Sequence, residues 1–268
     1  MMQRFLALLV FLVSLVGAAA PAHAQEPYFG YDAFPTPQID FTRWLYGERS
    51  RQIVGGALLM SQRDYGDQTG NSGTRRAGMT LPVDEPQRVT QLRASVTISD
   101  YELAGCVDNA TPSSVQARVL GSFFGAGPTS AGSQLNDVIG LTRMLRRSSS
   151  GDAPDVFVVE GLVVVCTASD CASSTLVGTV QSLGTVTQGT PARLALEWDA
   201  SNQTFYFQLN SDPKASVVYT GDIVSTPGLP FKQLDTRTEL ASCLSGPRTM
   251  ASVAGRFDNV QVNSSALP

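Results

Sequence analysis

Acidic side chains are the main candidates for acid–base chemistry in this chain, because the only histidine is His23, near the N-terminus. We expect that segment to be removed on export. The remaining chain then has no imidazole for a Ser-His-Asp or Cys-His nucleophile, for a histidine-ligated zinc ion or for acid–base catalysis near neutral pH. Three acids fall within strand-like runs, each alone in its run: Asp137, Glu160 and Glu197. A glycosidase would need two of them within about 5 to 10 Å of each other, and we expect each to be an outward-facing solubilising residue.

The cysteines are the second reactive set: Cys106, Cys166, Cys171 and Cys243. An even number in an exported chain indicates disulfides. Cys166 and Cys171 bracket a polar turn at 167–170, which suits a hairpin staple, and elimination then pairs Cys106 with Cys243. In the loop-entropy model the short bridge contributes about 2 kcal/mol and the long one about 5 kcal/mol. A four-cysteine metal site would need two close pairs of the Cys-x-x-Cys kind, and the chain has one close pair with a different spacing.

Sugar binding requires less than hydrolysis, namely an exposed aromatic ring and a few polar groups on a concave face or a loop. Tyr206 alternates with Phe205 and Phe207, so its side chain should face away from theirs. Arg118 and Arg143 fall in strand-like runs and could donate hydrogen bonds to a ligand. Simple cross-strand packing is the alternative role for Tyr206.

The polar segment 61–78 is expected to be a long loop. Long loops on rigid β-sandwiches often carry functional residues, so its acids Asp64 and Asp67 are further candidates for ligand binding. A solvated hairpin tip is the alternative interpretation.

The N-terminus has the three zones of a cleavable signal peptide: a basic residue, an apolar run at 5–16 and the small-x-small site Ala22-His23-Ala24. We expect cleavage after Ala24, which gives a signal peptide of residues 1–24 and a single mature domain of residues 25–268, secreted or periplasmic. The apolar run is too short to span a bilayer comfortably, for which about 20 apolar residues are needed. We therefore expect no membrane insertion.

The formal net charge of the whole chain is −4 and the sequence pI is near 5.0. Such a mildly acidic protein has no electrostatic attraction toward nucleic acid or toward an anionic membrane surface. We therefore expect neither of these as a partner.

Helical periodicity is nearly absent, and short β-rich runs are separated by Gly, Pro, Ser, Asp and Asn. In one run Leu194, Leu196 and Trp198 alternate with Ala195 and Glu197, which is typical of a half-buried strand. The pattern predicts strands at 52–60, 88–98, 115–124, 137–146, 156–165, 176–186, 193–198, 205–209, 215–220 and 251–262. So many strands indicate an all-β, two-sheet antiparallel sandwich or jelly roll.

Motifs near the two ends of the chain support this fold. The first part contains Asp-x-Phe at 32–34, Ile-Asp-x-x-x-Trp at 39–44 and Gly-x-Leu at 56–58, and the last part contains Phe-Asp-Asn-Val-x-Val at 257–262. Together they resemble the concanavalin A-like lectin/glucanase superfamily, a LamG-like jelly roll, and the resemblance extends over residues 28–263. It implies a two-sheet antiparallel β-sandwich, but this fold hosts lectins, glycosidases and adhesive modules alike.

The resemblance also implies a structural calcium ion beside the first and last strands. The matching positions are Asp32, the backbone carbonyl of Gly56 and Asp258, all oxygen ligands that suit a hard cation. Ala33 departs from the pattern, since many relatives carry an acid there. The alternative is that Asp32 and Asp258 only satisfy turn and edge hydrogen bonds.

Glycosidases of this superfamily carry their acids as Glu-x-Asp-x-x-Glu on one strand, and this motif does not occur here. We therefore expect an exported, non-catalytic binding module that recognises a glycan or a cell-envelope polymer, with aromatics along a concave face or in the 61–78 segment. A structural or protein-interaction domain without a small ligand is the alternative, and it should expose a contiguous apolar patch or a free strand edge. A glycosidase-like enzyme is the third possibility.

Overall fold

A computed structural model describes residues 48–266 of the chain. The predicted signal peptide, its cleavage after Ala24 and the predicted calcium ligand Asp32 lie outside these residues. Thirteen β-strands and one short 3-10 helix (Ser264–Ala266) make up the regular structure of 48–266. Within this range, no helix is long and apolar enough to cross a membrane.

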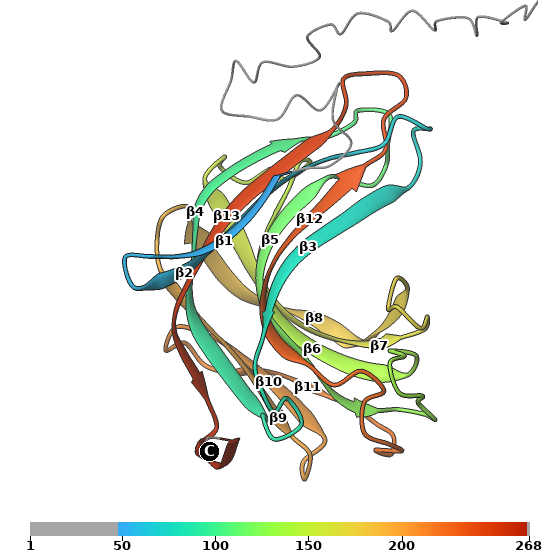
Figure 1. The fold of residues 1–268 in the computed structure, drawn as a ribbon, viewed down its shortest axis with the longest axis vertical. Helices are drawn as coiled ribbons and strands as arrows, with labels where there is room; N and C mark the ends of the chain where they lie inside the picture. Colours follow the sequence, from blue (N-terminus) through green and yellow to red (C-terminus); the bar gives the residue numbers. More distant parts are fainter. Residues whose placement is uncertain (1–47, 267–268) are drawn as a thin grey trace, which may run out of the picture. The chain divides into compact units, whose positions relative to one another are not determined.

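The strands form two antiparallel sheets, as predicted (Figure 1). The seven-stranded sheet has the order β1 (Glu48–Val54), β2 (Ala57–Tyr65), β13 (Met250–Val262), β4 (Gln91–Ala104), β9 (Ala192–Asp199), β10 (Thr204–Leu209) and β11 (Ala215–Val218). The six-stranded sheet has the order β3 (Thr74–Pro82), β12 (Lys232–Ala241), β5 (Ser114–Gly125), β6 (Asp137–Arg147), β7 (Val156–Cys166) and β8 (Ser174–Thr187). The first and last described strands, β1 and β13, both pair with β2.

The core lies between the sheets and is built by strict alternation along the strands. Phe205 and Phe207 on β10 are fully buried, whereas Tyr206 between them lies on the opposite face. Glycines on the facing sheet make room for both rings. A Cβ atom on Gly161 would lie 2.2 Å from Cγ of Phe207, and one on Gly140 would lie 3.0 Å from the Phe205 ring. The phenyl rings therefore fill positions that only glycine leaves open.

Both predicted disulfides are present. Cys106 pairs with Cys243 with their Cα atoms 5.5 Å apart, and Cys166 pairs with Cys171 with their Cα atoms 4.9 Å apart. The first joins the loop after β4 to the loop after β12, and the second closes the turn between β7 and β8. Such bonds form and persist in an oxidising compartment outside the cytoplasm.

Three sequence-based assignments were wrong. The segment predicted as one strand at 52–60 is a hairpin, because Gly55 and Gly56 adopt φ values of +57° and +80° and form a two-residue turn. The segment 61–78 is not a long loop, because β2 continues to Tyr65 and β3 begins at Thr74, which leaves only 66–73 as a connection. Strand β12 was not predicted at all.

Candidate functional site

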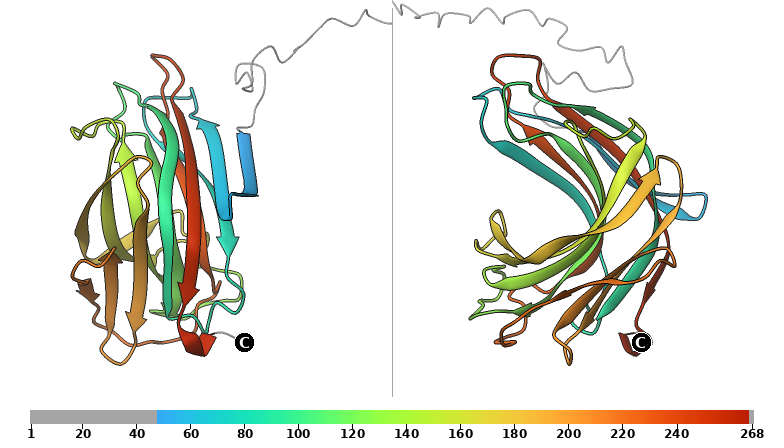
Figure 2. Two further views of the ribbon diagram at one scale, coloured as in Figure 1. Left: turned by 90° about the vertical axis from the view of Figure 1, so that its left-hand side faces the viewer. Right: turned by 180° about the vertical axis from the view of Figure 1, so that it is seen from behind.

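A groove of about 860 Å³ lies on the six-stranded sheet, on the face turned away from the seven-stranded sheet. The sheet is strongly curved, and this face is its concave side (Figure 1; Figure 2, right). The groove is lined by alternate residues of β12, β5, β6 and β7, together with residues of β3 and of the β7–β8 loop. Because alternate residues of a strand point to opposite faces, the neighbours of these lining residues pack into the core.

One row of the groove consists of four charged side chains in cross-strand register. The order across the sheet is Asp235, Arg118, Arg143 and Glu160. Arg118 donates from Nε and Nη2 to the two carboxylate oxygens of Asp235 at 2.7 and 2.8 Å. Arg143 donates from Nε and Nη2 to Oε2 of Glu160 at 3.0 and 2.7 Å. Each guanidinium in this row therefore has a carboxylate partner. Burial lowers the pKa of Arg143, and the negative charge of Glu160 partly offsets this decrease.

The next row, two residues further along β12, contains Arg237 directly opposite Gln116 on β5. Two atoms in this row, Arg237 Nε and Gln116 Oε1, are buried and have no hydrogen-bond partner among the described residues. Burial is the main cause that lowers the pKa of Arg237 to about 10, followed by the nearby guanidinium of Arg118. Arg237 is therefore still a cation at neutral pH, and within 48–266 it has no ion pair.

The row on the other side of the charged one is apolar. Leu120, Leu141 and Leu162 are cross-strand neighbours on β5, β6 and β7, and the half-buried Val164 and Phe231 pack against them. Phe231 is the one aromatic residue among the groove-lining residues that the structure describes. The groove therefore combines an apolar strip with hydrogen-bond donors, the combination typical of small-molecule and sugar sites.

A hydrogen bond joins the edge strand β3 to the β7–β8 loop at one side of the groove. Arg76 on the edge strand β3 donates from Nη1 to the carbonyl oxygen of Ala172 at 2.8 Å and from Nε to Glu239 at 3.1 Å. Ala172 follows the Cys166–Cys171 disulfide and precedes the other edge strand, β8. The stapled β7–β8 loop is thereby held against the groove.

The structure places only two of the five predicted ligand-binding residues in this groove, Arg118 and Arg143. Tyr206 lies on the other sheet, where it is paired with Glu197 across the strands and where Nζ of Lys214 lies 5.4 Å from its ring centroid. This contact matches the packing role considered for Tyr206 in the sequence.

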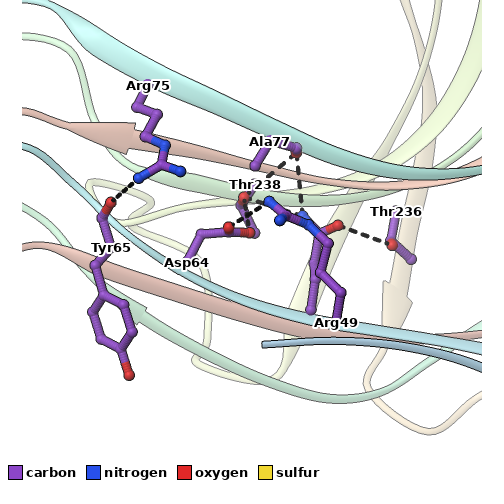
Figure 3. A network of polar contacts seen from close by, with 8 residues as sticks. Arg49, Asp64, Tyr65, Arg75, Ala77, Thr236 and Thr238 are labelled. Carbon is purple, nitrogen blue, oxygen red and sulfur yellow. Dashed lines mark hydrogen bonds and ion pairs between the residues drawn. The ribbon is translucent and has the colours of Figure 1, made fainter. Parts of the chain in front are cut away.

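Asp64 and Asp67 also lie away from the groove. Asp64 is fully buried, and it accepts hydrogen bonds from Nη2 of Arg49 at 2.7 Å and from Oγ1 of Thr238 at 3.0 Å (Figure 3). Gln62 extends this internal network by donating to Oγ1 of Thr238 at 3.1 Å. Asp67 is exposed on the β2–β3 connection, where its carbonyl oxygen accepts the N–H of Cys243 at 2.9 Å.

Two of the three predicted calcium ligands, Gly56 and Asp258, lie among the described residues. The pairing of Phe257 with Leu58 brings the exposed Asp258 close to the β1–β2 turn that contains Gly56. The same turn receives a guanidinium, because Nη2 of Arg256 donates to the carbonyl oxygen of Val54 at 3.4 Å. A positive charge beside the turn opposes a second one. Among residues 48–266, no group of three or more His, Cys, Asp or Glu side chains could hold a metal ion, and the calcium ion stays a prediction.

The three acids considered for catalysis do not converge. Glu197 lies on the seven-stranded sheet and pairs with Lys214 at 2.5 Å. Glu160 is level with Arg143 in the sheet, and Asp137 lies six residues further along β6, which is roughly 20 Å at 3.3 Å per residue. Asp137 instead accepts the backbone N–H groups of the 228–229 turn at 2.7 and 3.1 Å. Burial raises its pKa, and these hydrogen bonds counteract the increase.

The sequence reasoning missed Gln116 and Arg237. Arg237 lies on the strand that was not predicted, and Gln116 lies on a predicted strand but was not singled out. A signal for β12 was present in the sequence. Polar or charged residues occupy every second position of this strand, and the positions between them are Leu234, Thr236, Thr238 and Leu240. Such period-two alternation is the pattern of a strand with one solvated face.

No protein-family model matches the sequence, and the comparison with curated proteins gives no match either. Among solved structures, the chain is similar to the carbohydrate-binding module CBM66 from Bacillus subtilis, with 10% identity over 82% of this chain and 94% of that chain and a TM-score of 0.32. It is also similar to a legume lectin-like domain from Entamoeba histolytica, with 10% identity over 79% of this chain and 88% of that one and a TM-score of 0.31. The kappa-carrageenase from Pseudoalteromonas carrageenovora gives 8% identity, 84% and 91% coverage and a TM-score of 0.30.

The fold is a two-sheet antiparallel β-sandwich of the jelly-roll kind. Two curved antiparallel sheets face each other, and the first and last described strands both pair with β2. This is the arrangement that the sequence resemblance implied. These similarities are distant and say nothing about the function of the chain.

Proposed function

We propose that this protein is an exported, non-catalytic binding module whose concave groove holds a glycan or another polymer of the cell envelope. The observation that carries this proposal is the order of the groove rows. The apolar strip of Leu120, Leu141 and Leu162 lies next to a row with two arginines. A sugar ring has the same two-sided character, since its C–H groups pack on apolar side chains while its hydroxyls exchange hydrogen bonds with polar ones.

The position of the groove supports the same function. Its floor consists of β-strands, and its polar side chains are held by ion pairs within the sheet. A rigid, preorganised surface loses little conformational entropy when it binds a ligand. Catalysis would need a second acid near Glu160, and the other two candidate acids lie elsewhere.

A glycan array with the mature protein tests this proposal, run once with calcium and once with a chelator. Leu141→Glu places a charge in the middle of the apolar strip and should abolish binding. Val218→Glu is the matched control, because Val218 is 64% exposed on β11 of the other sheet, and it should bind as the wild type does. Wild-type binding that survives in both variants would show that the glycan binds outside the groove.

Export is part of the proposal. Intact mass measurement of the protein from its native host should give a chain that begins at Gln25, as expected after cleavage behind Ala24. A chain that retains Met1 would contradict the proposed secreted or periplasmic location.

One observation favours a protein-interaction domain as the second candidate. The edge strand β11 and the residues after it expose apolar side chains, with Val218 64%, Val224 54% and Ile223 45% exposed. An exposed apolar strand edge is a typical place for another chain to pair. No binding across a diverse glycan array, together with an envelope protein captured by the wild type but not by Val218→Glu, would favour this function.

A further inference from the structure

Two buried polar atoms in the groove lack partners, and they belong to the same cross-strand pair. Arg237 Nε and Gln116 Oε1 are the only two such side-chain atoms in the described part of the chain, and the two residues lie opposite each other on β12 and β5. A buried polar group without a partner costs roughly 1 to 3 kcal/mol. Two of them at one point of a groove therefore indicate a place where a ligand supplies the missing partners.

We propose that this pair recognises an acidic sugar, a uronate unit within the polymer that the proposed function assigns to the groove. The carboxylate of the uronate accepts the Nε–H of Arg237, and a hydroxyl group of the sugar donates to Gln116 Oε1. This inference rests on the proposed function and narrows the class of its ligand to glycans with carboxylate groups.

The charge of the groove explains why the ligand is an anion. Three of its arginines are neutralised within the protein: Arg76 by Glu239, Arg118 by Asp235 and Arg143 by Glu160. The one remaining acid on the lining, Asp170, is exposed and accepts the N–H of Ala172 at 3.0 Å within its own loop. Arg237 makes no ion pair within 48–266, although the carboxylates of Asp235 and Glu239 lie close enough to raise its pKa, and charge-assisted hydrogen bonds to a carboxylate are the strongest that a guanidinium makes.

The acceptor opposite Arg237 explains why the ligand is a sugar acid and not a simple inorganic anion. Gln116 is only 3% exposed, and its Nε2 already donates to Ser114 at 3.4 Å. Its Oε1 needs a donor, which sulfate does not have and which hydrogenphosphate has only as a single O–H group. A uronate has hydroxyl donors close to its carboxylate, and the neighbouring leucine strip can pack against its C–H face.

Calorimetry with matched oligosaccharides tests this inference on the mature protein. The probes are tetramers of galacturonate, mannuronate and glucuronate, each compared with its own methyl ester, which keeps the sugar rings and hydroxyls, adds one methyl group per unit and has no charge. At least one free acid should bind roughly tenfold or more tightly than its ester, because a charge-assisted hydrogen bond is lost in the ester. Arg237→Met should remove this difference, and Arg193→Met, an exposed arginine on the other sheet, should keep it.

A second readout uses the wild-type protein and does not depend on how the variants fold. The side-chain Nε–H resonance of Arg237 should shift strongly on titration with the acid tetramer and much less with its methyl ester, whose carbonyl oxygen is a weaker, uncharged acceptor. Gln116→Leu should weaken the binding of both, since the lost contact is to a hydroxyl group.

The outcomes separate the inference from the proposed function. Esters that bind as tightly as acids, or acids that bind Arg237→Met unchanged, overturn the uronate site while the glycan-binding function stands. The uronate site is also overturned if no uronate tetramer binds while a sulfated tetramer binds and its binding is lost in Arg237→Met. If no acidic or neutral oligosaccharide binds and the Arg237 resonance does not move, both are wrong.

Discussion

Two adjacent rows of the same concave sheet differ in whether their arginines have hydrogen-bond and ion-pair partners. In one row Arg118 is 8% exposed and its partner Asp235 is 2% exposed, and both nitrogens that face the carboxylate donate to it. In the next row Arg237 has neither a carboxylate nor a partner for its buried Nε. Both arginines lie on the concave face, but Arg118 is buried and Arg237 is half-buried. The main difference is the carboxylate that the register of β12 and β5 places opposite Arg118 and not opposite Arg237.

The comparison separates structural charges from charges that are available to a ligand. A guanidinium whose charge is neutralised by a carboxylate of its own sheet contributes to the fold and offers a ligand its remaining N–H donors but no net charge. A buried guanidinium without hydrogen-bond partners lowers the stability of the fold, and proteins tolerate such destabilising groups mainly at functional sites. The presence of arginine in a groove is therefore less informative than the list of acceptors around it.

The largest expected effect is on the paired row. Arg118→Met leaves the buried Asp235 without its counter-ion, and we expect the free energy of unfolding to fall by about 3 to 5 kcal/mol. Urea denaturation of the wild type and the variant measures this. Adding Asp235→Leu should restore most of the loss, and a single variant as stable as the wild type would contradict the distinction between the rows.

A buried lysine outside the groove sharpens the comparison. Lys232 is 2% exposed, has no carboxylate partner among the described residues, and donates to the carbonyl oxygens of Pro86 at 2.9 Å and Ser122 at 2.5 Å. Its ammonium lies 4.2 Å from the ring centroid of Phe123. Burial lowers its pKa to about 7.

The pH dependence of stability follows from this shift. Between pH 7 and its ordinary pKa of 10.5, the unfolded chain holds a proton that the folded chain has released, so stability rises with pH in this window. Below pH 7 both states are protonated and the cost is constant. The free energy of unfolding of the wild type should therefore approach that of the more stable Lys232→Met variant by roughly 3 kcal/mol between pH 7 and pH 10. A gap that does not change with pH would show that Lys232 titrates normally.

The third effect concerns the loop that borders both rows. Replacing Cys166 and Cys171 by serine removes the short disulfide, and the free energy of unfolding should fall by about 2 kcal/mol. Amide hydrogen exchange should increase in 167–174 and stay unchanged in β5 and β12. Equal protection of the loop in both proteins would show that the contact between Arg76 and Ala172 holds it without the disulfide.

The smallest effect on stability, with the opposite sign, is expected for the unpaired row. Arg237→Met removes a desolvated cation that lacks a counter-ion, so the free energy of unfolding should rise by roughly 1 kcal/mol. Thermal unfolding measures the change. A clear loss of stability would mean that Arg237 supports the fold, and the contrast with Arg118 would disappear.

Strands with an apolar inner face could be predicted from the sequence, because alternation is a local property. This is why β5, β6, β7, β9 and β10 were located closely, and why Arg118 and Arg143 were recognised as strand residues. Strand β12 has Thr236 and Thr238 at inward positions and charges at outward ones, so it did not stand out as β-rich.

The pairing state of each arginine was not accessible from the sequence. Arg118 and Asp235 lie 117 positions apart, and only the register between β5 and β12 decides that they meet while Arg237 meets Gln116. A shift of one residue would turn every side chain to the other face. The disulfide pairing was predictable because one loop is short enough to select its partner.

The phenyl rings that enter the Gly140 and Gly161 positions have a consequence for how quickly the groove can be occupied. Because a Cβ atom at Gly161 would overlap the Phe207 ring, the two layers interlock and resist sliding past each other. The sheets that form the groove therefore have no open and closed arrangement to interconvert before a ligand enters, and only side chains such as Arg237 and Gln116 have to turn to meet it. The observed association rate should therefore rise linearly with ligand concentration, without the plateau that a slow rearrangement imposes.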